Sequence, residues 1–201
     1  MVFNSFAFFV FLAICLVVYR WLPHRGQNLF LLAASYFFYG AWDWRFLGLI
    51  LFSTLVDFGV GIGLGATRDP RRRRWLLAAS LATSLGLLGF FKYAGFFAAS
   101  LARLASLFGV ALSPLELGIV LPVGISFYTF QTMGYVIDVY RGRVAPARNL
   151  LDFAAFVAFF PQLVAGPIER AESLLAQIQA PRRQTLEKFS TGAWLILWGL
   201  F

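Results

Sequence analysis

Long apolar runs, separated by short clusters of arginine, proline and other polar residues, follow one another along most of the chain. A helix needs roughly 20 residues to cross the hydrocarbon core of a bilayer, with a range of about 17–25. The pattern therefore predicts an all-α integral membrane protein whose helices cross the bilayer several times within one transmembrane domain, residues 1–201. The predicted spans are 4–20, 28–44, 46–65, 75–91 and 117–139.

The stretch after the fourth run is amphipathic instead of uniformly apolar. Apolar side chains recur there at helical spacing, and polar side chains fall on the opposite side. The apolar set is Phe97, Leu101, Leu104 and Phe108, and the polar set is Ser100, Arg103 and Ser106. One face is too polar for lipid, so the pattern predicts a helix lying in the outer interface of the bilayer.

A shorter apolar segment at 153–168 is interrupted by Pro161, Gly166 and Pro167, and basic residues flank it at both ends. This pattern predicts a re-entrant segment that enters and leaves the membrane on the cytoplasmic side. Backbone that is not helical is tolerated at membrane depth only where protein shields it or where it lines a cavity. We therefore expect the segment to border a site. A last apolar run, 191–201, is too short to span and is interpreted as the start of a further span in a longer chain.

The basic residues supply an orientation. Lys and Arg accumulate in the loops that stay in the cytoplasm. If the N-terminus lies outside, only Arg45, Lys92 and Arg103 of the 17 basic residues also lie outside. The distribution predicts a multi-pass protein of a bacterial inner membrane in this orientation.

Composition agrees with a lipid environment. Hydrophobic residues make up 60% of the chain and charged residues 13%, whereas a soluble domain usually carries about 25% charged residues. The net charge of +8 could suit nucleic acid. The basic residues stand between apolar runs, however, and no basic domain accompanies them. We therefore expect the lipid bilayer, and no nucleic acid, as a partner.

Polar side chains cluster in the sequence LPVGISFYTFQ at 121–131. Pro122 lacks an amide hydrogen and should kink or break the helix, and Gly124 allows a neighbouring backbone to approach. The polar residues within the predicted span are Ser126, Tyr128, Thr129, Gln131 and Thr132. Gln131 is the costliest of them in lipid and should face the protein interior, a partner or water. Two interpretations stay open: hydrogen bonding between helices, or the wall of a substrate path.

Other candidate residues favour structural interpretations. Asp57 is the one acidic group deep in a span and is a functional candidate for that reason, although a role in fixing helix packing is favoured. Gly61 and Gly65 have the spacing of close helix packing. Cys15 is interpreted as an apolar filler and His24 as a residue of a turn between spans. The sequence contains no metal-binding motif, so no metal is expected.

Two longer stretches resemble a known family. LPVGISFYTFQTMGYVIDVYRG at 121–142 and FFPQLVAGPIER at 159–170 are similar to signature segments of the membrane-bound O-acyltransferases. The opening MVFNSFAFFVFL, SYFFYGAWDWRF at 35–46 and LILWGLF at 195–201 resemble the alginate-type bacterial branch of that family in particular.

The resemblance implies a ring of helices around a tunnel that joins the two faces of the bilayer. It implies an acyl donor such as acetyl-CoA on the cytoplasmic side, no bound cofactor, and a periplasmic polysaccharide acetyltransferase as partner. The catalytic histidine of the family lies downstream of Phe201, so we expect no catalytic residue within 1–201 and no acetyl transfer by these residues alone. The residues that match family stretches near the tunnel are Ser126, Tyr128, Gln131, Pro161, Gln162, Gly166 and Pro167.

The resemblance therefore implies a membrane O-acyltransferase component that moves an acetyl group across the membrane for O-acetylation of an exported polysaccharide. Two alternatives stay open. A secondary transporter would also contain broken helices near the membrane midplane, but the 121–131 pattern has no second copy in the chain. A non-catalytic scaffold that binds partners through its spans is the other alternative.

Overall fold

The computed structural model describes residues 5–108, 120–163, 166–182 and 185–200. These residues form helices joined by short turns, with no strand among them, so the prediction of an all-α chain is confirmed. The α-helices are α1 (Phe6–Trp21), α2 (His24–Asp43), α3 (Leu47–Ala66), α4 (Pro70–Leu88), α5 (Ala94–Leu107), α6 (Ile125–Tyr140), α7 (Leu150–Val157), α8 (Phe160–Leu163), α9 (Ala171–Gln179) and α10 (Leu186–Leu200). The 3₁₀ turn η1 (Trp44–Phe46) joins α2 to α3, and the π-helical turn η2 (Gly89–Tyr93) joins α4 to α5.

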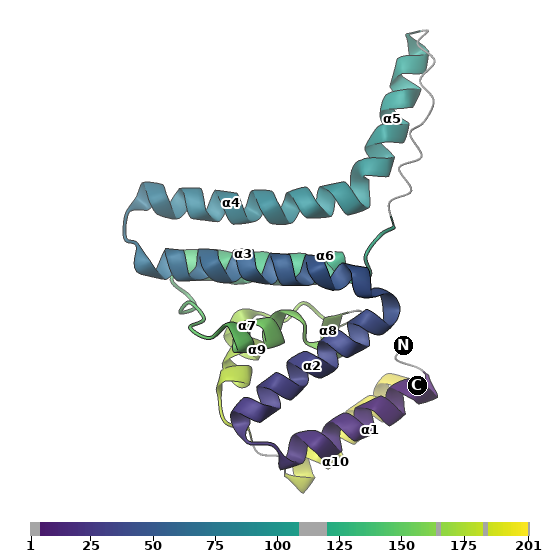
Figure 1. Ribbon diagram of the computed structural model, residues 1–201, viewed down its shortest axis with the longest axis vertical. Coiled ribbons are helices and arrows are strands. Elements are labelled where there is room, and N and C mark those ends of the chain that lie inside the picture. The colour runs from purple at the N-terminus through teal and green to yellow at the C-terminus, as the bar shows by residue number, and fades with distance from the viewer. Residues whose placement is uncertain (1–4, 109–119, 164–165, 183–184, 201) are drawn as a thin grey trace.

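Two continuous helical stretches are long and apolar enough to cross a membrane: His24–Ala66, with 43 residues, and Pro70–Leu107, with 38. Each is about twice the length that one crossing requires. In Figure 1 the first stretch changes direction where α2 meets α3, and the second where α5 leaves the axis of α4. Each stretch therefore contains two helices of different direction. The number of membrane crossings stays a prediction.

Helices α3, α4 and α6 pack together as a three-helix unit. The two glycines of α3 make this approach close. A methyl group added at Gly61 would overlap the hydroxyl of Tyr135 on α6, and one added at Gly65 would come within 2.5 Å of the Pro146 ring. The prediction that Gly61 and Gly65 serve close packing is confirmed.

Arg73 at the start of α4 holds the ends of the other two helices of this unit. Its guanidinium donates to the carbonyl of Tyr140 at 2.7 Å, to that of Thr67 at 3.3 Å and to that of Leu64. The last carbonyls of a helix have no partner within the helix, and Arg73 supplies one for α3 and for α6. The C-terminal ends of α3 and α6 therefore lie together, beside the N-terminal end of α4. These are the relative directions that the predicted topology requires.

Helix α4 begins earlier than predicted. The Asp69 carboxylate accepts hydrogen bonds from the backbone N–H of Arg71 at 3.1 Å and of Arg72 at 3.4 Å, and Pro70 occupies the first helical position. An aspartate cap followed by proline is a strong helix start. The arginine cluster 71–74, expected in a loop, therefore forms the first turn of α4.

Other boundaries also differ from the predictions. Helix α2 begins at His24, not at 28, so this histidine opens a helix instead of lying in a turn. Helix α6 begins at Ile125, three residues after Pro122, which confirms the predicted break; the first part of the predicted span 117–139 includes residues outside the described part. Helix α10 begins at Leu186, five residues before the apolar run.

The predicted interfacial helix corresponds to α5. It continues from α4 through η2 and extends away from the other helices (Figure 1). Its large apolar side chains, including Phe97 and Leu101, are 53–81% exposed, and no residue of α5 is buried. The place of α5 in a bilayer interface stays a prediction.

Candidate functional site at the junction of the two signature segments

The irregular backbone before α6 is enclosed by two other helices. Gly124 has a φ of +75°, a conformation that residues with a side chain adopt at a cost. A Cβ added there would lie 2.5 Å from the carbonyl oxygen of Leu163 at the end of α8. From α2, the Tyr39 hydroxyl donates to the carbonyl of Val123 at 2.8 Å. The predicted close approach at Gly124 is confirmed, and it joins the segment 121–131 to the segment 159–168.

The predicted re-entrant stretch is two short helices, α7 and α8, with a break between them. The side-chain amide of Gln131 on α6 donates to the carbonyl of Phe156, close to the end of α7, at 3.0 Å. The hydroxyl of Ser35 on α2 accepts from the N–H of Phe160, at the start of α8, at 3.2 Å. Side chains thus satisfy backbone groups that the break releases. Residues 153–158 are all buried, so protein shields the break, as irregular backbone in a membrane requires.

The predicted lining residues differ in burial. Tyr128, Gln131 and Gln162 are buried, Ser126 and Gly166 are half-buried, and Pro161 and Pro167 are exposed. Ser126 accepts a hydrogen bond from the Lys92 ammonium at 3.3 Å. Gly166 donates its N–H to the Gln162 carbonyl at 3.1 Å. The seven residues lie on two segments that touch, but among the described cavities Gln131 lines one and Pro161 another.

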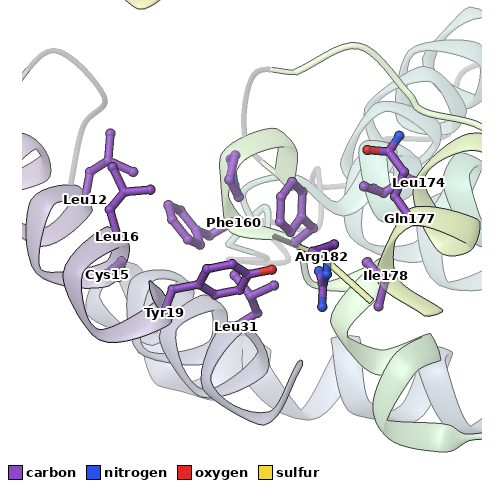
Figure 2. Close-up of a pocket in the computed structure, with 12 residues that line it drawn as sticks. Leu12, Cys15, Leu16, Tyr19, Leu31, Phe160, Leu174, Gln177, Ile178 and Arg182 are labelled. Atoms are coloured by element: carbon purple, nitrogen blue, oxygen red, sulfur yellow. The ribbon is translucent and has the colours of Figure 1, made fainter. Parts of the chain in front are cut away.

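The cavity beside Pro161 has a volume of about 260 Å³ and lies between α1, α2, α8 and α9. Figure 2 shows the side chains of α1 on one side, those of α9 on the other, and Phe160 between them. Most of the wall is apolar. Its polar side chains include Gln177 and Arg182, and the Arg182 guanidinium lies 5.5 Å from the centre of the Tyr19 ring.

A buried asparagine connects three helices next to this cavity. The Asn28 amide on α2 donates to the Asp152 carboxylate at 2.7 Å and to the Ile178 carbonyl at 3.1 Å, and it accepts from Arg182. Asn28 is 1% exposed. No local sequence pattern predicts this network. Asn28 opens the second apolar run, where a polar residue is ordinary, and its partners lie 124 to 154 positions away.

A second cavity, of about 270 Å³, follows α6 toward its C-terminal end. Gln131 lines it within α6, Arg141 and Arg143 line it where α6 ends, and Arg170 lines it from the residue before α9. In the sequence these arginines indicate orientation alone, and no local pattern indicates that they share a cavity with Gln131.

Asp57 lies in the three-helix unit, and none of the described cavities includes it. It is fully buried on α3. The hydroxyl of Ser80 on α4 donates to Asp57 Oδ1 at 2.5 Å, and Thr132 on α6 interacts with the same carboxyl group. The carboxyl thus connects all three helices, which supports the interpretation that Asp57 fixes helix packing. Within the described residues, no group of three or more His, Cys, Asp and Glu side chains could hold a metal ion.

Comparison with known proteins supports the resemblance to the membrane-bound O-acyltransferases. Over 196 residues, or 96% of the chain, the identity is 46% to the probable alginate O-acetylase AlgI of Pseudomonas putida and 45% to that of Azotobacter vinelandii. The peptidoglycan O-acetyltransferase of Helicobacter pylori is 32% identical over 234 residues, a match that covers the whole chain. The predicted resemblance is confirmed.

The chain spans 40%, 38% and 43% of the lengths of these three relatives, respectively. No family model matches the chain, and no solved structure matches it. The relatives are membrane acyltransferases, which agrees with the two long apolar helical stretches described above.

Proposed function

We propose that this chain forms part of a membrane O-acyltransferase that transfers acetyl groups to an exported polysaccharide. The observation that carries the proposal is the similarity over 96% of the chain to proteins named alginate O-acetylase. The relative named for peptidoglycan acts on another glycan, so the shared part of these names is O-acetylation of a polysaccharide. The contact between the two signature segments supports the proposal, because irregular backbone at membrane depth is found where protein encloses it or where it lines a cavity.

We further propose that the chain is a multi-pass protein of a bacterial inner membrane. The segment α7–α8 would be re-entrant from the cytoplasmic side. The arrangement of α3, α4 and α6 supports this topology: the ends that meet at Arg73 carry the arginine cluster 71–74 and lie beside Arg141 and Arg143, where the positive-inside rule requires basic residues.

The chemistry of the donor and the position of the acceptor determine what happens on each side of the membrane. A thioester such as acetyl-CoA is charged and stays on the cytoplasmic side, whereas the acceptor is outside. The acetyl carbonyl of the donor would reach the acceptor through a tunnel that has Gln131 in its wall and leads toward Ser126, which lies in the first turn of α6 and bonds to Lys92. The thioester C–S bond would break as the acceptor oxygen bonds to the carbonyl carbon, and the thiol would stay with its carrier on the cytoplasmic side. A catalytic histidine outside these residues would act in the transfer, and a periplasmic acetyltransferase would then modify the polymer.

Alginate-type polymers are favoured over peptidoglycan as acceptors, because the identity to the alginate O-acetylases is 46% against 32% for the peptidoglycan enzyme. The test is deletion of the complete gene in its host, followed by mild alkaline release and quantification of ester-linked acetate. Exported uronate polymers and peptidoglycan are assayed separately. The expected result is loss of acetate from the exported polymer, unchanged acetate in peptidoglycan, and recovery when the gene is restored.

Unchanged acetate in every exported glycan would refute the proposal. A scaffold would give a different result, because acetate would then fall only as far as partner proteins are lost from the membrane. A transporter would change the uptake of a small solute and leave ester-linked acetate unaffected. Immunoblots of the partner proteins and uptake assays in the same strains separate these three functions.

A further inference from the structure

Helix α1 borders two cavities that lie side by side. One is the cavity beside Pro161, and the other is a third cavity between α1 and α10. Four residues of α1 line each cavity, at the spacing of one helix face. Two of them, Leu12 and Leu16, line both cavities. The row formed by these two side chains therefore separates two neighbouring spaces, which together are called the α1 cleft.

The third cavity is the larger part of the α1 cleft, with a volume of about 590 Å³. Figure 1 shows α10 beside α1. On α10 the wall includes the small residues Gly192 and Ala193, and a Cβ added at Gly192 would meet no atom within 4 Å. Pockets that hold small molecules commonly measure about 300–1,000 Å³. The space between the two helices is therefore large enough for an apolar ligand.

Two cations line the α1 cleft, one in each cavity. Arg182 lies over Tyr19 in the last turn of α1, and Lys188 lies in the first turn of α10. The Arg182 guanidinium donates to Asn28, but its Nε is buried and has no hydrogen-bond partner among the described residues. Neither cation forms an ion pair within the described part of the chain. The cleft thus combines apolar walls with positive charge that lacks a counter-ion.

This combination matches an amphiphile with a negative headgroup. In the proposed topology α1 ends and α10 begins at the cytoplasmic side, where anionic lipid headgroups attract basic residues and occupy basic pockets between helices. A free phosphate ion would leave the apolar walls uncovered. A helix is a single rod about 10 Å wide and would not enter both cavities, whereas a phospholipid has two separate chains.

We propose that the α1 cleft binds one anionic phospholipid of the cytoplasmic leaflet. Its phosphate lies between Arg182 and Lys188, and its two acyl chains lie on either side of the row Leu12 and Leu16. The phosphate supplies the acceptor that Arg182 Nε lacks, and one chain fills the space between α1 and α10. This site goes beyond the proposed function: it requires a membrane location but no acyl transfer.

The headgroup is tested with the complete protein, stripped of lipid in detergent and titrated with phosphatidylglycerol or phosphatidylcholine, with bound lipid counted by native mass spectrometry. Phosphatidylglycerol should bind more tightly. Arg182→Gln/Lys188→Gln should raise its Kd by about tenfold for each cation removed and leave the Kd of phosphatidylcholine unchanged. Lys188→Gln alone, which spares the hydrogen bond to Asn28, should give about tenfold. The control is Arg20→Gln, an exposed cation of α1 that lines neither cavity.

The chain positions are tested with Gly192→Leu, which should raise the Kd of phosphatidylglycerol by filling the cleft. Gly199→Leu is its control on α10, because an added Cβ also meets nothing there but the position lines no described cavity. A phosphatidylglycerol with a diazirine in its acyl chain should label residues 9–16 and 189–197 on illumination.

Three results would overturn the inference. The first is an equal Kd of phosphatidylglycerol for wild type and the double variant, or for the two glycine variants. The second is equal labelling by the phosphatidylcholine analogue, which would assign the contacts to bulk lipid. The third is no labelling of either segment, which would mean that another part of the complete protein covers the α1 cleft.

Discussion

Gly124 is the point where the two signature segments touch, and its replacement by alanine tests that contact. A side chain at a φ of +75° costs about 1–2 kcal/mol. The added Cβ would also lie 2.5 Å from the Leu163 carbonyl oxygen, which belongs to the backbone and cannot turn aside. Overpacking of this kind costs about 1–3 kcal/mol. Alanine also lowers the conformational entropy of the unfolded chain, and this effect offsets about 0.4–1 kcal/mol of the lost stability.

The expected loss of stability for Gly124→Ala is therefore about 1–4.5 kcal/mol. Gly142→Ala is the matched control, because Gly142 has a φ of +72° and open space around its Cα. In this control variant only the backbone conformation is unfavourable, so its free energy of unfolding should fall by about 1 kcal/mol. Gly134 lies within α6, and alanine there has neither the conformational nor the steric cost. The free energy of unfolding of Gly134→Ala should therefore rise by about 0.5–1 kcal/mol.

The free energies of unfolding are measured for the purified protein in mixed detergent micelles, as a function of denaturing detergent. The difference between Gly124→Ala and Gly142→Ala isolates the contact with Leu163. If the two variants are equally destabilised, α8 does not approach the segment before α6, and the site described here is wrong. Intrinsic fluorescence and protease resistance of the folded variants verify that each begins from the native state.

Three further substitutions test other contacts by the same unfolding assay. Gln131→Leu leaves the Phe156 carbonyl without its donor and should cost about 1–2 kcal/mol; no loss would mean that the break between α7 and α8 is satisfied in another way. Arg73→Ala removes the hydrogen-bond donor shared by the ends of α3 and α6, and it should lower the free energy of unfolding by about 2–3 kcal/mol. Arg73→Lys should lower it by less. If Arg73→Ala is as stable as the wild-type protein, the guanidinium does not hold these helix ends. Gly61→Ala should cost about 1–3 kcal/mol by displacing the tyrosine hydroxyl of α6, whereas Gly59→Ala, which meets nothing, should be neutral or stabilising; equal effects would contradict close packing at Gly61.

Local rules predicted a large part of this fold. The apolar runs identified the long helices, because lipid tolerates little polar surface. Pro122 marked the start of α6, since proline cannot continue a preceding helix. Gly61, Gly65 and Gly124 were correctly assigned to close approach, because glycine is the residue that permits it.

The remaining errors arose where a local pattern had two meanings. The cluster 71–74 was placed in a loop because arginine marks the cytoplasmic side, but Asp69 and Pro70 begin a helix there. Helix α9 was not predicted, because its nine residues are too few to give a clear apolar period. In the first case, charge dominated the interpretation although Asp69 and Pro70 gave a helix-start signal.

Contacts between distant segments could not be predicted from one sequence. Asn28 and Ile178 are 150 positions apart, and nothing at either position indicates the other. Arg141 and Arg170, which both line the second cavity, also come from different segments. Such pairs depend on how helices pack, so the candidate residues were predicted individually, whereas the cavities that they line became known only from the structure.

The break between α7 and α8 has a consequence for synthesis. Its two side-chain partners precede it in the chain, Ser35 by 125 positions from Phe160 and Gln131 by 25 from Phe156. Chains emerge from the ribosome N-terminus first, so both partners are already made when the broken segment leaves the exit tunnel. The segment can then pack against helices that are already inserted. Its irregular backbone groups find their hydrogen-bond partners at once and are not left unpaired in lipid.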